Sequence, residues 1–188
     1  MSWVRIPPNP HEVVPLLSPA SVLIYCRTFH ENERKMLIVT QSSIDSKMAT
    51  NNNDNLLKQV IKAENSHDVE KLVALVTDDL VIEDVPFVPF GMVMKGKDGV
   101  RQGYTGFIEA TPDFKIEPKS WVTNDRSFAS EWVLTATQKG DLPGIPASGK
   151  QFSIRGCSFG EFKNGKLKGR RDYWDYASLR KQLTEEPK

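Results

Sequence analysis

One aspartate near the C-terminal end of the chain has neighbours that suit proton transfer. Asp172 lies in the run GRRDYWD, and the period-two alternation of a strand places it on one face with Arg170 and Trp174. A carboxylate in an apolar site has a raised pKa, so it could take a proton from carbon and return it to oxygen, whereas a guanidinium within about 4–6 Å lowers that pKa. From the residues alone, an ion pair between Asp172 and Arg170 on a solvated strand edge is the simpler interpretation.

A second acid, Asp84, ends the run DDLVIED directly before Val85 and Pro86. Two interpretations stay open for it. Asp84 caps the turn at Val85 and Pro86, or it faces a pocket as a second proton carrier.

The composition excludes several other kinds of site. The chain has two cysteines and three histidines, too few for a disulfide framework and without the spacing of a metal site. The net charge of +1 predicts no nucleic-acid partner and no acidic membrane partner. No run of about 18 apolar residues is present. We therefore expect a cytoplasmic protein of one domain, with no metal, no nucleic acid and no membrane partner.

The order of the predicted elements, helices first and strands after, is typical of an α+β fold. Asn51–Asp54 offer capping residues before a first helix, and Thr77–Asp79 are expected to end a second one. The run PFVPFGMVMKG is broken by two prolines and a glycine, so we expect a loop there. Apolar spacing predicts helices at 56–65, 69–76 and 98–110. Turn signals separate predicted strands at 80–85, 114–124, 127–140, 150–164 and 166–176, and a short helix is expected to close the chain at 176–183.

Alternation along the last two strands predicts which side chains face inward. On the strand at 150–164, Cys157 belongs to the face that is expected to point away from the pocket. The opposite face of this strand is expected to point into the pocket. On the next strand, after the Asn164–Gly165 turn, Leu167, Arg171 and Tyr173 lie opposite Asp172. The predicted inward set is Phe152, Ile154, Gly156, Ser158, Gly160 and Phe162.

Residues 1–47 differ in character from the rest of the chain. Five prolines between positions 7 and 19 break any helix, and the runs VLIYC and MLIVT have no convincing pairing. The opening WVRIPP can be encoded by TGG GTT CGA ATC CCG CCN, which contains the T-arm sequence GGTTCGAATCC of a tRNA gene. We therefore expect a start codon assigned too early, with Met48 as the true start, or else a disordered, divergent leader. In either case 1–47 is not part of the domain, which covers 48–188.

From about residue 54 to residue 183 the chain resembles the SnoaL-like polyketide cyclases of the NTF2-like superfamily. The resemblance rests on NSHDVEKLVALVTDDLVIED, on TATQKGDLPGIPASGKQF, and on GKLKGRRDYWDYASLRKQL, which aligns without gaps. It implies a cone in which three N-terminal helices pack on a curved antiparallel sheet and a short C-terminal helix closes the chain. It also implies that Asp172 is the catalytic aspartate and that Asp175 matches a second recurring acid.

The resemblance implies acid/base chemistry without a cofactor, and a homodimer. In the family, this aspartate is the general acid and base of an aldol ring closure. This chain has Gly156 and Ser158 where the cyclases place a glutamine and a histidine, so a smaller or more apolar carbonyl compound is the expected substrate. We expect the substrate to contact six residues: Phe87, Phe90, Trp132, Phe152, Ser158 and Trp174.

Two alternatives remain. The ketosteroid-isomerase-like branch of the superfamily resembles DDLVIEDVP, with Asp84 as general base, but its oxyanion-hole positions correspond here to Val60 and Ser158. Without those donors an enolate loses several kcal/mol of stabilisation, so isomerase chemistry is disfavoured. The other alternative is a non-catalytic module for binding small molecules or for dimerisation. The environment of Asp172 distinguishes them: an apolar cavity favours an enzyme, and an exposed ion pair favours a binding module.

Overall fold

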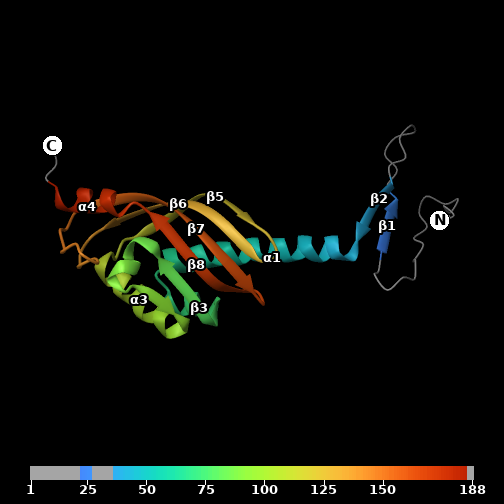
Figure 1. Ribbon diagram of the computed structural model, residues 1–188, viewed down its shortest axis with the longest axis horizontal. Coiled ribbons are helices and arrows are strands. Elements are labelled where there is room, and N and C mark those ends of the chain that lie inside the picture. The colour runs from blue at the N-terminus through green and yellow to red at the C-terminus, as the bar shows by residue number, and fades with distance from the viewer. Residues whose placement is uncertain (1–21, 27–35, 186–188) are drawn as a thin grey trace. The chain divides into compact units, whose positions relative to one another are not determined.

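The computed structural model describes residues 22–26 and 36–185. These residues belong to two compact units, which divide between Ala49 and Thr50. Figure 1 shows the order of the elements. These are β1 (Val22–Cys26), β2 (Met36–Thr40), α1 (Gln41–Asn65), α2 (Val69–Ala74), β3 (Val76–Asp84), the 3-10 helix η1 (Val85–Phe90), β4 (Val93–Lys95), α3 (Gly96–Ala110), β5 (Lys115–Thr123), β6 (Ser127–Thr137), β7 (Gln151–Lys163), β8 (Lys166–Trp174) and α4 (Tyr176–Thr184).

In the first unit, the two apolar runs pair with each other. β1 and β2 form an antiparallel ladder from Val22 opposite Thr40 to Cys26 opposite Met36. The prediction that these runs lack a partner was wrong, because two five-residue segments of high β propensity satisfy each other's backbone groups. The rest of the first 35 residues lies outside the described part of the chain. A start at Met48 stays a prediction.

The first helix begins fifteen residues before the predicted start at Leu56. α1 starts at Gln41, so Asn51–Asp54 lie within it instead of capping it. Contacts with the sheet explain why these polar residues are tolerated there. Asn53 donates to the Asn124 carbonyl at 2.8 Å, and Asp54 accepts from the Trp121 indole at 2.5 Å.

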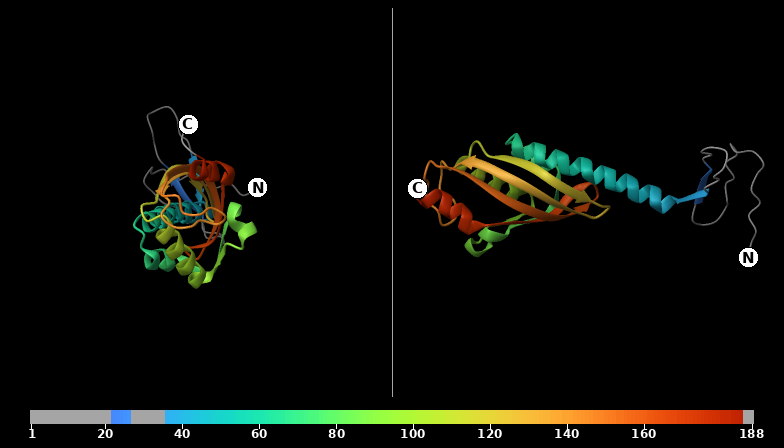
Figure 2. Two further views of the ribbon diagram at one scale, coloured as in Figure 1. Left: turned by 90° about the vertical axis from the view of Figure 1, so that its left-hand side faces the viewer. Right: turned by 90° about the horizontal axis from the view of Figure 1, so that it is seen from above.

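The second unit has the predicted α+β architecture. Six strands form one curved sheet in the order β4-β3-β8-β7-β6-β5, and α1 and α3 pack on its concave face (Figure 2). Val60 of α1, Val100 of α3 and Ile82 of β3 are among the most buried residues of that core. The sheet is not wholly antiparallel, because β3 and β8 run parallel.

The segment between α2 and α3 departs from the prediction in two places. α2 ends at Ala74 and β3 begins at Val76, so Thr77–Asp79 belong to a strand and do not end a helix. The buried Val76 and Leu80 hold that part of the strand in the core. The expected loop contains a 3-10 helix with a proline in its first turn, and then β4, which pairs with β3.

A bulge changes the face of one predicted residue. The β7–β8 register shifts between Glu161 and Phe162, so that Leu167 pairs with Phe162. The prediction placed Leu167 on the outer face, but it is 1% exposed in the core. An extra residue at a bulge reverses the alternation beyond it. Residues 170–174 lie on the other side of the bulge, and the predicted alternation holds there.

None of the described helices is long and apolar enough to cross a membrane.

Candidate active site

A single row of polar side chains crosses the concave face of the sheet. In the strand register, Ser130 of β6 is opposite Ser158 of β7, and Ser158 is opposite Asp172 of β8. Asp172 is in turn opposite Asp84 of β3. Residues opposite each other in neighbouring strands lie side by side on one face, so the sheet brings the two candidate acids together although they are far apart in the sequence.

This row opens on a cavity of about 740 Å³ between the sheet and the helices. Its walls include both aspartates and five of the six residues predicted to contact substrate, which are Phe87, Trp132, Phe152, Ser158 and Trp174. The sixth, Phe90, does not line it. The Phe90 ring is 49% exposed and packs on Phe87 and Tyr176.

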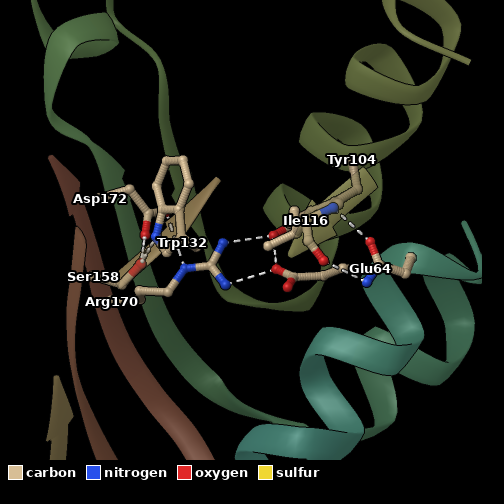
Figure 3. Close-up of polar contacts among 8 residues, drawn as sticks. Glu64, Tyr104, Ile116, Trp132, Ser158, Arg170 and Asp172 are labelled. Atoms are coloured by element: carbon tan, nitrogen blue, oxygen red, sulfur yellow. Dashed lines mark hydrogen bonds and ion pairs between the residues drawn. The ribbon is translucent and has the colours of Figure 1, made fainter. Parts of the chain in front are cut away.

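Donors surround Asp172 on both sides (Figure 3). One carboxylate oxygen accepts from the Ser158 hydroxyl at 2.5 Å, and the other accepts from Arg170 Nε at 3.0 Å. The Trp132 indole donates to the Ser158 oxygen at 2.8 Å, and because an indole N–H can only donate, it directs the serine proton toward Asp172. Asp172 is therefore placed as an acceptor, which favours its ionised form.

Arg170 also pairs with a second carboxylate, which the sequence analysis missed. Its Nη1 lies 2.6 Å from Glu64 of α1, and its Nη2 donates to the Tyr104 hydroxyl of α3 at 2.6 Å (Figure 3). Tyr104 in turn donates to Glu64. Helical spacing could have revealed Glu64, because it follows Leu57 and Val60 by seven and four residues and so shares their buried face.

Burial and charge act in opposite directions on Asp172. It is 8% exposed, and this burial raises the pKa of its carboxyl above the usual value. The charge of Arg170 and the hydrogen bond from Ser158 lower that pKa, while the charge of Glu64 raises it. Asp172 thus faces the cavity and also forms an ion pair with Arg170. A cavity was the environment expected of an enzyme, and an ion pair the one expected of a binding module.

Asp84 has a different environment from Asp172. Among the described residues, the Trp174 indole donates the one hydrogen bond to its side chain, at 2.5 Å. Burial, and then the negative charge of Asp172, raise the pKa of Asp84 to about 7, against weaker lowering effects of Trp174 and Arg170. Asp84 precedes η1 but its side chain makes no capping hydrogen bond, so the interpretation of Asp84 as a turn cap was wrong.

Two glycines of β7 explain how the cavity wall is built without the glutamine and histidine that the resemblance implies at positions 156 and 158. A Cβ on Gly156 would lie 2.2 Å from the Trp132 ring, and a Cβ on Gly160 would lie 2.2 Å from the Phe128 ring. Each ring belongs to the residue opposite the glycine on β6. The missing side chain at Gly156 is therefore replaced by the Trp132 indole, which also supplies the hydrogen bond to Ser158.

Asp175, the second acid implied by the resemblance, lies outside the cavity lining. It is the N-cap of α4, and its carboxylate accepts from the Ser178 backbone N–H at 3.2 Å. Its position is explained by capping. Among the described residues, no group of three or more His, Cys, Asp or Glu side chains could hold a metal ion.

Comparison with known families gives one match. The family model of the SnoaL-like polyketide cyclase matches residues 54–183. None of the curated proteins compared with the chain matches it.

Solved structures with the same fold are numerous. AclR, a putative hydroxylase from Streptomyces galilaeus, has a TM-score of 0.60 and 22% identity over 74% of this chain and 87% of its own. A putative SnoaL-like polyketide cyclase from Jannaschia sp. CCS1 has a TM-score of 0.65 and 12% identity over 74% and 96%. IdmH, a putative polyketide cyclase from Streptomyces antibioticus, has a TM-score of 0.60 and 20% identity over 70% and 98%. At these identities the likeness shows the fold.

The raised pKa of Asp84 predicts a pH-dependent stability. The folded protein holds the Asp84 proton up to about pH 7, whereas an unfolded aspartate releases it near pH 4, so stability falls as pH rises between these values. Asp84→Asn removes this loss. Urea unfolding should show the variant more stable than wild type by up to about 4 kcal/mol at pH 8 and nearly equal at pH 4.

Asp78→Asn is the control, because Asp78 is on the same strand and its pKa is lowered by Lys97. That variant should gain no stability at pH 8. Parallel stability curves for wild type and Asp84→Asn would contradict the assignment of a protonated Asp84.

Proposed function

Because the chain belongs to the SnoaL-like polyketide cyclase family, we propose that it is an acid/base enzyme that enolises a small carbonyl compound and closes a ring by aldol addition. Asp172 is the general base and Asp84 the general acid. The observation that carries this proposal is the pairing of the two carboxyl groups in adjacent strands, facing one cavity with unequal hydrogen bonding.

The division of roles follows from the donors around each acid. Asp172 accepts from Ser158 and Arg170, and an ionised carboxylate is the better acceptor. Asp84 accepts a hydrogen bond from the Trp174 indole and lies beside the charge of Asp172, which favours the protonated form of Asp84. Two interacting acids that titrate at different pH supply one base and one acid near neutrality.

Each proton and electron pair has a defined path. Asp172 takes the proton from the carbon next to the substrate carbonyl, the C–H electrons form the enol double bond, and Asp84 gives its proton to the carbonyl oxygen. The enol carbon then attacks a second carbonyl carbon. The enol proton returns to Asp84, and Asp172 gives its proton to the new alkoxide oxygen. Both acids regain their starting states, and general acid/base catalysis of this kind contributes roughly 10²–10⁴ in rate.

A ketosteroid-isomerase type of reaction is less well supported. The Ser158 hydroxyl, at one of the two oxyanion-hole positions, directs its proton to Asp172 and not into the cavity. Val60, at the other position, has no donor in its side chain.

A second candidate is a module that binds small molecules without reaction. Its support is the ion pair between Arg170 and Asp172, which opposes the rise in the Asp172 pKa.

The cytoplasmic location stays a prediction.

A homodimer is also proposed, formed through the outer face of the sheet. Val122, Phe159 and Tyr173 are apolar or aromatic and are 70%, 50% and 39% exposed. They lie on β5, β7 and β8, and the rings of Phe159 and Tyr173 meet edge to face at 6.0 Å. Exposed apolar side chains that gather on one face mark an interaction surface.

The dimer predicts a mass of twice 21.2 kDa for the full chain in sedimentation equilibrium. Phe159→Glu should shift the mass to that of one chain, because a charge would be buried at the interface. Val88→Glu, on η1 and 38% exposed, is the control and should leave the mass unchanged. A monomeric wild-type chain would refute this part of the proposal.

The catalytic proposal predicts that Asp172→Asn abolishes enolisation. The probe is 2-tetralone, a small bicyclic ketone, and the measurement is the exchange of its α-protons in D₂O, followed by ¹H NMR. Wild type should accelerate the exchange over buffer, and Asp172→Asn should lower the rate by at least about 10²-fold, because the amide is not a base.

Asp175→Asn is the matched control, since it makes the same change three residues away and asparagine also caps helices. It should exchange like wild type. Equal rates in wild type and Asp172→Asn, or a wild-type rate equal to buffer, would count against the proposal.

A further inference from the structure

The polar row does not end at Ser158. Ser130 is the next residue along it, on β6, and its side chain lines the cavity. No other residue of the described chain hydrogen-bonds to the Ser130 hydroxyl, in contrast to Ser158, whose donor and acceptor sides are both occupied. Ser130 therefore offers the cavity an uncommitted donor and acceptor.

Aromatic rings flank this serine on its own strand. Phe128 and Trp132 precede and follow it by two residues, so they share its face. Their rings lie over Gly160 and Gly156 of β7. Because Ser130 and Ser158 are small, the polar row at β6 and β7 forms the floor of a trough between the Phe128 and Trp132 rings, and a flat ring system fits such a space.

The length of the trough follows from strand spacing. Ser130 and Asp84 are three strands apart in the row, which is about 14 Å at about 4.8 Å per strand. Two hydrogen bonds of about 2.8 Å leave roughly 8 Å between the ligand atoms that make them. This is about the separation of oxygens at opposite ends of a bicyclic ring.

The charges of the cavity also restrict the ligand. Arg170 is the basic residue among its lining residues, and it already pairs with Asp172 and Glu64. An anionic ligand would thus meet carboxyl groups without an available counter-ion, which is unfavourable in a buried site.

We propose that Ser130 binds the far end of the ligand, and that the ligand is a neutral, flat, fused-ring ketone with a second oxygen group roughly 8 Å from its carbonyl. The placement of the ketone carbonyl at the Asp84 and Asp172 end of the row rests on the proposed function. Ser130 sets specificity and takes no part in proton transfer.

The test compares two probes, 2-tetralone and 6-hydroxy-2-tetralone, which differ by a hydroxyl at the far end of the second ring. Isothermal titration calorimetry of the full chain should give a Kd for the hydroxylated ketone about fivefold lower than for 2-tetralone, as expected for one hydrogen bond. Ser130→Ala should bring the two Kd values within twofold of each other and leave that of 2-tetralone unchanged.

Ser153→Ala serves as the control, because Ser153 is exposed on β7 and lies outside the cavity lining. It should retain the wild-type preference. A preference that survives in Ser130→Ala, no preference in wild type, or no binding of either ketone would overturn the inference. Normal preference without Asp172-dependent exchange would instead refute the catalytic proposal and leave the role of Ser130 intact.

Discussion

The arrangement of the cavity depends on one buried guanidinium shared by two carboxylates. Arg170 joins β8 to α1 through Glu64 and to α3 through Tyr104, while its Nε holds Asp172. Loss of one partner of such a buried pair costs about 3–5 kcal/mol, because the remaining charge is left uncompensated. The same cation that fastens the helices to the sheet thus fixes the position of the candidate base, and stability and site geometry are linked through it.

Sharing that cation also leaves Asp172 more basic than a simple ion pair would. Glu64 takes part of the stabilisation by Arg170, and its negative charge raises the pKa of Asp172. The remaining negative charge acts on Asp84 in the neighbouring strand, whose pKa rises to about 7. One row of the sheet therefore holds two acids of the same type in different electrostatic surroundings, on which the proposed division of roles rests.

Much of this site could be predicted from the sequence, but the contacts between side chains of different strands and helices could not. Alternation placed Asp172 and Trp174 on the inner face correctly, and the resemblance gave the fold. The bulge that reverses Leu167 has no sequence signal. The contact between Asp84 and Asp172 arises from parallel pairing of strands far apart in the chain, which local patterns do not encode. Glu64 was missed because its role appears only when α1 meets β8, although its helical spacing pointed inward.

The central claim is that Asp84 is protonated and Asp172 ionised in the same cavity near neutral pH. The most direct test is a ¹³C NMR titration of the aspartate carboxyl groups in the full chain, with resonances assigned by Asp84→Asn and Asp172→Asn. The account predicts that Asp84 titrates near pH 7 and Asp172 at lower pH, and that Asp172→Asn lowers the Asp84 value because the neighbouring charge is gone. Titration of Asp84 near pH 4, or no response of Asp84 to the loss of Asp172, would contradict it.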